Sequence, residues 1–222
     1  MIRLQKTVKP SILVSHAANW TKALTDKLAR NEKPTKAEAS RYRHEDIKLA
    51  LIEETKGKCA YCESKLLNIE YGDIEYIYPK SLDPLKTFEW DNLTLACDIC
   101  NGNKSNKDPY IESILDPYIA NPDEYLIFIG HYLFSAGKPA GISTITILEL
   151  NRVALIERRK EHIDRIMLIY DVLLREDIPL ITKQGIYKNL KEQDGGEAGP
   201  YSGMIRALIE GMRSKIPPEL EL

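Results

Sequence analysis

The stretch that organises this sequence is "KCAYCE", Lys58–Glu63, together with "GDIEYIYPKSLDPLKTFEWDNLTLACDICNGNK", Gly72–Lys104. The chain has four cysteines, and they form two Cys-x-x-Cys pairs separated by 34 residues: Cys59 and Cys62, then Cys97 and Cys100. A Cys-x-x-Cys turn directs two thiolates at one point, so two such turns complete a closed tetrahedral zinc site. The spacing therefore predicts a structural zinc centre that staples this region together.

Disulfide bonds and redox catalysis are the alternative uses of paired cysteines. Disulfides are disfavoured in a reducing cytosol, where adjacent Cys-x-x-Cys pairs are more often bound to metal. A redox pair of the thioredoxin kind needs a βαβ setting, and the sequence has no such pattern around either pair. We therefore expect zinc.

The residues between and after the cysteine pairs follow a definite order. A short β-like run contains Glu75 and Tyr76, and it is followed by Pro-Lys, by "WDNL" at 90–93, and by Asn101 after the second pair. In this order the segment resembles the ββα-metal, or HNH, nuclease motif carried on a zinc-binding treble-clef frame. It is similar in particular to the HNH proteins of Septu-type anti-phage systems and of some retrons, the PtuB-like family.

The resemblance implies a role for each residue of the motif. Glu75 matches the metal-binding acidic residue, Asn92 the middle Asn that supports the turn, and Asn101 the final metal ligand, while Tyr76 stands at the position of the general-base His. Hydrolysis of a phosphodiester needs a divalent cation on the scissile phosphate and a base that accepts a proton from water. Oxygen donors suit Mg²⁺ or Mn²⁺.

Each of these residues also has an ordinary structural explanation. Glu75 fits an exposed strand carboxylate, Asn92 a turn residue, and Asn101 a helix cap after the second cysteine pair. Their order inside the double Cys-x-x-Cys frame favours the HNH interpretation over three unrelated coincidences.

The tyrosine at position 76 raises a chemical difficulty. A histidine with a pKa near 6.5 accepts a proton readily at pH 7, whereas a tyrosine with a pKa near 10 is ionised in only about one molecule per thousand. Three interpretations follow: an inactivated copy, a slow nuclease, or a nuclease in which another group is the base. The histidines of the chain are remote from the motif in sequence: His16, His44, His131 and His162. Among them His44 is the least unfavourable substitute.

Composition places the chain among ordinary globular proteins. It has 222 residues, 43% hydrophobic and 29% charged, with no apolar run long enough for a membrane helix and no secretory signal pattern. We expect a cytoplasmic protein. The net charge is −2, but residues 1–50 carry 11 Lys and Arg against 5 Asp and Glu, which makes this segment a candidate phosphate-facing surface or a solvated helix face.

The flanks are mostly helical by pattern. We expect a helix containing Trp20, Leu24 and Leu28 with Ser15 as its cap, a second helix over 36–56 closed by Gly57, a β-hairpin around Gly137 and Gly141, a long helix over 150–175, an exposed loop at 194–200, and a last helix over 201–215. These elements divide into a basic helical segment at 1–57, the zinc and HNH module at 58–110, and a hairpin with helices at 111–222. The predicted fold class is α+β, a zinc-stapled treble-clef core in a mostly helical frame.

The resemblance implies an HNH endonuclease subunit of an anti-phage complex that acts on DNA, impaired by Tyr76, with an ATPase of the ABC or SMC-like type as its partner. Candidate DNA contacts near the motif are Lys65, Lys80, Lys104 and Lys107. One alternative is a catalytically inactive scaffold or DNA-binding subunit of the same complex. Another is a zinc-ribbon interaction module, in which Glu75 and Asn101 do not converge.

Overall fold

The computed structural model describes residues 1–66 and 72–221. Its helices are α1 (Ser11–Ala29), α2 (Lys36–Ala39), α3 (Glu45–Glu54), α4 (Asp98–Lys104), α5 (Pro139–Ile147), α6 (Val153–Leu174), α7 (Leu180–Asn189) and α8 (Ser202–Met212). Its strands are β1 (Asp73–Tyr76), β2 (Leu93–Ala96), β3 (Leu126–Ile129) and β4 (Tyr132–Ser135). Short 3₁₀ turns follow α2 at Arg41–Arg43 and precede β2 at Pro84–Phe88 and Trp90–Asn92, and a π-helical turn, Leu190–Asp194, extends α7.

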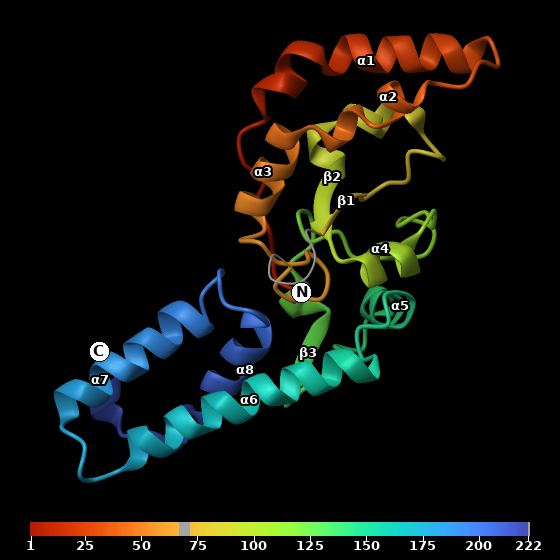
Figure 1. Ribbon diagram of the computed structural model, residues 1–222. Coiled ribbons are helices and arrows are strands. Elements are labelled where there is room, and N and C mark those ends of the chain that lie inside the picture. The colour runs from red at the N-terminus through yellow and green to blue at the C-terminus, as the bar shows by residue number, and fades with distance from the viewer. Residues whose placement is uncertain (67–71, 222) are drawn as a thin grey trace.

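The antiparallel pair β1–β2, with α4 after it, forms the centre of the first half of the molecule. Asp73 pairs with Ala96 and Tyr76 with Leu93, so the strand before the Pro-Lys turn lies beside the strand that leads into the second cysteine pair. All four residues of β2 are buried, which explains why this strand reads as a nearly continuous apolar run. Figure 1 shows α1, α2 and α3 around this unit and α5 to α8 in the other half of the molecule.

The predicted β-hairpin is present but lies earlier than expected. β3 and β4 turn at Gly130, which has φ +57°, and not at Gly137 or Gly141. The β-branched stretch "ISTITI" belongs to α5, which begins at Pro139. Gly141 is required there because a Cβ atom would lie 2.3 Å from the carbonyl oxygen of Tyr125. Tertiary packing therefore overrides the β propensity of this segment.

The N-terminal helices also differ from their predicted boundaries. α1 begins at Ser11 directly after Pro10, so Ser15 lies inside the helix and is not its cap. The helix expected over 36–56 is broken: Thr35 and Glu38 form a capping box that starts α2, and His44 caps the separate helix α3. The break places the buried Tyr42 in a 3₁₀ turn beside the central strands.

The segment 194–200 is not an exposed loop throughout. Gly195 and Gly199 are buried, and the buried ammonium of Lys58 donates to the carbonyl oxygen of Gly199 at 2.9 Å. The carboxylate of Glu63 accepts from the Ser202 hydroxyl at 3.0 Å and from the Gly203 amide at 3.2 Å. The start of α8 is thus docked on the residues that flank the first cysteine pair.

The fold class is α+β, as the sequence predicts. The long helix over 150–175 is present as α6, and its buried positions include Ile166, Tyr170 and Leu173. The last helix is present as α8, and α7 is an additional helix that the sequence pattern did not indicate. No described helix combines the length and the apolar composition that a membrane span requires.

Candidate metal centre and functional groove

The four cysteines converge at the junction of the two halves. Their Sγ atoms all lie within 4.8 Å of one another, and the Sγ atoms of Cys62 and Cys97 are 3.9 Å apart. All four residues are buried, and they are the single group of His, Cys, Asp and Glu ligands of this kind among the described residues. A tetrahedral zinc ion with Zn–S bonds of about 2.3 Å needs sulfurs about 3.8 Å apart, so this donor set fits zinc.

Each pair of cysteines is shaped by backbone hydrogen bonds. The Cys59 amide donates to the Ser64 carbonyl at 2.9 Å and the Glu63 amide donates to the Cys59 carbonyl at 3.0 Å, which closes a tight turn with Glu63 at φ +63°. In the second pair, the Cys100 amide donates to the Cys97 sulfur at 3.4 Å, at the start of α4. Zinc at this position would join the first turn to the helix that carries Asn101.

A groove of about 440 Å³ lies beside this centre, between the 3₁₀ turn at 41–43, β1 and α4. Glu75, Tyr76 and Asn101 all line it, together with Lys80 and Tyr42. The structure therefore brings three of the four residues of the motif to one surface. The remaining one, Asn92, lies behind that surface in the turn that supports it. No histidine is among the described residues that line the groove.

Glu75 is a buried carboxylate that pairs with a buried lysine. Its Oε1 lies 2.8 Å from Nζ of Lys104, and both side chains are nearly inaccessible, at 6% and 1%. The same ammonium donates to the Tyr76 carbonyl oxygen at 2.7 Å. Burial raises the pKa of Glu75, although the charge of Lys104 opposes the shift. Glu75 is consequently not the exposed strand carboxylate of the ordinary explanation.

Tyr76 is packed as an aromatic core residue at the edge of the groove. It is 8% exposed, its ring lies 5.2 Å from the ring of Tyr42, and Nζ of Lys80 lies 4.7 Å from its centre. The hydroxyl has no hydrogen-bond partner among the described residues. Burial raises the pKa of Tyr76 above its usual value, and the neighbouring Tyr42 and Glu75 raise it further. The hydroxyl therefore stays protonated at neutral pH, although Lys80 lies nearby.

Asn92 holds the chain that leaves β1. Its Oδ1 accepts from the Tyr78 amide at 2.7 Å, and its Nδ2 donates to the carbonyl oxygens of Tyr78 at 3.0 Å and of Lys86 at 3.1 Å. The side chain thus satisfies three backbone groups across the loop that contains Pro79 and Lys80. The family role of the middle Asn as a support of the turn agrees with this geometry.

Asn101 faces the groove from the first turns of α4. Its Nδ2 donates to Oδ2 of Asp73 at 3.0 Å, which leaves its carbonyl oxygen as the donor available to a cation. Asp73 and Asp98 also line the groove, and sequence reasoning missed both. A signal was present for Asp73, because residues two apart in a strand point to the same face as Glu75.

Two of the sequence-based assignments, one DNA contact and the substitute base, do not fit the structure. Lys104 is 1% exposed and engaged with Glu75, so it is wrong as a DNA contact, whereas Lys107 is exposed and Lys80 reaches the groove. His44 caps α3, accepting from the Asp46 amide at 3.3 Å, and it does not line the groove. His44 therefore does not offer a base to the groove.

Comparison with known families matches residues 59–107 to the model of the HNH endonuclease family. The chain carries an HNH endonuclease domain. The HNH domain covers the two cysteine pairs, β1, β2 and α4, and it ends at Lys107. The resemblance inferred from the sequence is confirmed at the level of this family.

Two curated relatives extend the similarity beyond the HNH domain. The Septu protein PtuB of Bacillus thuringiensis is 30% identical over 154 residues, which cover 69% of this chain and 56% of the relative. The Septu protein PtuB of Bacillus mycoides (strain KBAB4) is 28% identical over 194 residues, which cover 72% of this chain and 66% of that relative. The chain thus spans between about half and two thirds of the relatives it matches.

Proposed function

We propose that this chain is an HNH nuclease subunit of a Septu-type anti-phage complex in which Tyr76 impairs DNA hydrolysis. The observation that carries the proposal is the shared groove of Glu75, Tyr76 and Asn101 inside the HNH domain. The names of the relatives support the defence system, and the domain supports the reaction class. The zinc-ribbon alternative is disfavoured, because it requires Glu75 and Asn101 to face different surfaces.

The residues divide the chemistry between them. Cys59, Cys62, Cys97 and Cys100 would hold zinc, while Glu75 and the carbonyl oxygen of Asn101 would hold Mg²⁺ or Mn²⁺. Such a cation neutralises charge on the scissile phosphate and stabilises the leaving oxygen. Asn92 orients the loop that carries Lys80, and Lys80 and Lys107 contact the DNA backbone.

The impairment follows from the environment of residue 76. A general base must accept a proton near neutral pH, and the raised pKa of the buried Tyr76 hydroxyl prevents this. Loss of general-base catalysis typically lowers a rate by about 10²- to 10⁴-fold. The second candidate function, a catalytically inactive scaffold or DNA-binding subunit, is favoured by one observation: Glu75 is already paired with Lys104.

Plasmid nicking in Mg²⁺ or Mn²⁺ tests these two candidates. We expect Tyr76→His to cut supercoiled plasmid at least about a hundred-fold faster than the wild-type chain, with Tyr76→Phe as the control of equal packing. The nicking rate of Tyr76→His should rise with pH as the imidazole loses its proton near pH 6.5. The nicking rate of the wild-type chain should not show this rise. A Tyr76→His chain that does not cut at any metal concentration supports the scaffold, and wild-type cutting at the rate of Tyr76→His refutes the impairment.

The complex and its setting complete the proposal. We propose an ABC or SMC-like ATPase as the partner, supplied in trans, and the cytoplasm as the compartment, where four thiols stay reduced and can bind zinc. Residues 1–57 form a basic helical unit, 58–110 the nuclease unit, and 111–222 a unit packed on it. Affinity purification of the tagged chain from its host should bring down such an ATPase, and purification of the chain alone would contradict this partner.

A further inference from the structure

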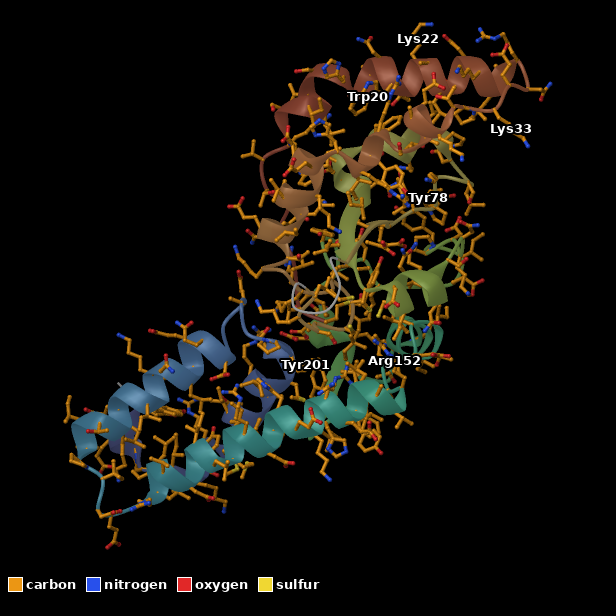
Figure 2. All side chains as sticks on the ribbon, viewed as in Figure 1. Trp20, Lys22, Lys33, Tyr78, Arg152 and Tyr201 are labelled. Atoms are coloured by element: carbon orange, nitrogen blue, oxygen red, sulfur yellow. The ribbon has the colours of Figure 1, made fainter. Side chains whose placement is uncertain are left out.

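One arginine outside the HNH domain lies against the cysteine cluster. The Nη1 atom of Arg152 donates to the Cys100 sulfur at 3.8 Å, and Nη2 donates to the Cys97 sulfur at 3.9 Å. The two nitrogens of one guanidinium therefore reach the two sulfurs of one cysteine pair. Figure 2 labels Arg152 at the N-terminal end of α6, the end nearest α4.

The position of Arg152 is held by the residues before it. Asn151 forms two hydrogen bonds with Leu133 of β4, accepting from its amide at 3.0 Å and donating to its carbonyl at 2.7 Å. Glu149, at φ +48°, accepts from Nδ2 of Asn103 in α4 at 3.2 Å. The turn before α6 is thus fixed to the hairpin and to α4, and it aims the guanidinium at the sulfurs.

The contact between Arg152 and the cysteine sulfurs is electrostatically favourable. Four thiolates around one Zn²⁺ carry a net formal charge of about −2, and an uncompensated charge of this size in a buried site is unfavourable. Arg152 supplies one positive charge at the sulfurs. Arg159, seven residues later on the same helix, is fully buried, and its Nη1 donates to the Leu150 carbonyl at 2.8 Å. Burial lowers the pKa of Arg159 and the Cys62 thiolate opposes that shift, so Arg152, which caps α6, and Arg159 within it are two cations on the side where the thiolates lie.

We propose that Arg152 is a positioning residue for the zinc centre: its guanidinium holds Cys97 and Cys100 in their metal-binding geometry and so fixes the C-terminal half to α4. Because α4 also carries Asn101 and Lys104, the contact connects α6 to the groove through the zinc centre. The proposal depends on zinc at the four cysteines and is independent of whether the chain cleaves DNA.

Zinc release to a chromogenic chelator tests this role without an activity assay. We expect Arg152→Met to bind zinc about 10- to 100-fold more weakly than the wild-type chain, the range of affinity lost when a partner of a metal ligand is removed, and therefore to release zinc faster. Arg152→Lys should release zinc at an intermediate rate, since the lysine ammonium keeps the positive charge but lacks the planar guanidinium whose two nitrogens reach two sulfurs. The matched control is Arg158→Met on the same helix, where the side chain is 67% exposed and pairs with Glu161 at 3.0 Å.

Mapping of alkylated cysteines separates this role from a general loss of folding. In Arg152→Met, Cys97 and Cys100 should react with iodoacetamide before Cys59 and Cys62, while the far-ultraviolet circular dichroism is unchanged. Release at the wild-type rate, or equal reaction of both pairs, overturns the proposal. If Arg152→Met does not fold, Arg152→Lys decides the question. Zinc release from Arg152→Lys at the rate of Arg158→Met then refutes the proposal that the guanidinium holds both sulfurs.

Discussion

Tyr76 and Glu75 are neighbours in β1, yet each is buried in a different way. Glu75 has an ionic partner in Lys104, whereas the Tyr76 hydroxyl has none among the described residues. Removing one partner of a buried ion pair strongly destabilises the folded protein, because the other charge stays buried and unpaired. Removing a hydroxyl that has no hydrogen-bond partner changes the stability little. The two residues therefore predict opposite responses to substitution.

Tyr76→Phe should leave the free energy of unfolding unchanged within about 0.5 kcal/mol, or raise it, because the deleted hydroxyl makes no hydrogen bond to the described residues. Tyr118→Phe is the matched control. The Tyr118 hydroxyl contacts the carboxylate of Glu54 and the hydroxyl of Thr94, so this change should cost about 1.5–3 kcal/mol. Urea denaturation measures both, and a decrease above about 1 kcal/mol for Tyr76→Phe would show that the hydroxyl is bonded.

Lys104→Met should lower the free energy of unfolding by about 3–5 kcal/mol, because it leaves the Glu75 carboxylate buried without its cation. Lys107→Met, in the exposed segment after the same helix, should change stability by less than about 0.5 kcal/mol. The double variant Glu75→Gln with Lys104→Met should recover most of the decrease. Equal stability of Lys104→Met and the wild-type chain in urea would mean that the pair is not closed in solution.

The connection between β1 and β2 depends on one side chain in a similar way. Asn92 is buried and bonds to the backbone of Tyr78 and Lys86, while the strands on either side are only four residues long. Short strands have few ladder hydrogen bonds of their own, so the loop between them must supply its own order. Asn92 provides that order for the segment that carries Lys80.

Asn92→Ala should lower the free energy of unfolding by at least about 2 kcal/mol, since it leaves three backbone groups without partners. In a chain that also carries Tyr76→His, the same change should reduce plasmid nicking through displacement of the loop. Asn106→Ala, exposed at the groove, is the control and should leave stability unchanged. A fully stable Asn92→Ala chain would remove Asn92 from the supporting role.

The molecule as a whole is nearly neutral, but its charge is unevenly distributed. The basic surplus of residues 1–50 lies largely on α1, α2 and the turns around them, and Figure 2 shows Lys22 and Lys33 along the edge of the molecule away from α6. The proposed DNA-binding groove is lined by one lysine, Lys80, among its described residues, together with acidic side chains, so DNA binding requires additional basic side chains. The basic N-terminal segment can supply them.

Lys33→Glu together with Lys36→Glu should weaken binding to a labelled DNA duplex and flatten its salt dependence, by about 0.9 in the log–log slope for each DNA phosphate that the variant no longer neutralises. Lys188→Glu is the control, because that side chain is 72% exposed on α7, in the C-terminal half. Fluorescence anisotropy over a range of salt concentrations measures both. Identical slopes of affinity against salt concentration for the two variants would mean that the DNA does not contact Lys33 or Lys36.

Much of the site was predictable because its determinants are local. The spacing of Cys59, Cys62, Cys97 and Cys100 predicts two tight turns whose sulfurs converge. The order of Glu75, Asn92 and Asn101 in the same segment is readable from its resemblance to the HNH motif. The 3–4 residue periodicity of 150–175 likewise predicts one long helix, and α6 is that helix. The hairpin turn was displaced and "ISTITI" became helical, because packing against Tyr125 outweighs local propensity there.

The residue types and spacings of this chain are sufficient to predict the α+β class and the clustering of its thiols, and their resemblance to the HNH motif is sufficient to predict the HNH domain. They are insufficient for the Glu75–Lys104 pair, the burial of Tyr76 and the approach of Arg152 to Cys97 across 55 residues. Those features depend on which groups leave water together when distant segments pack. Desolvation and charge pairing act between residues in space, and no pattern along the chain reports them.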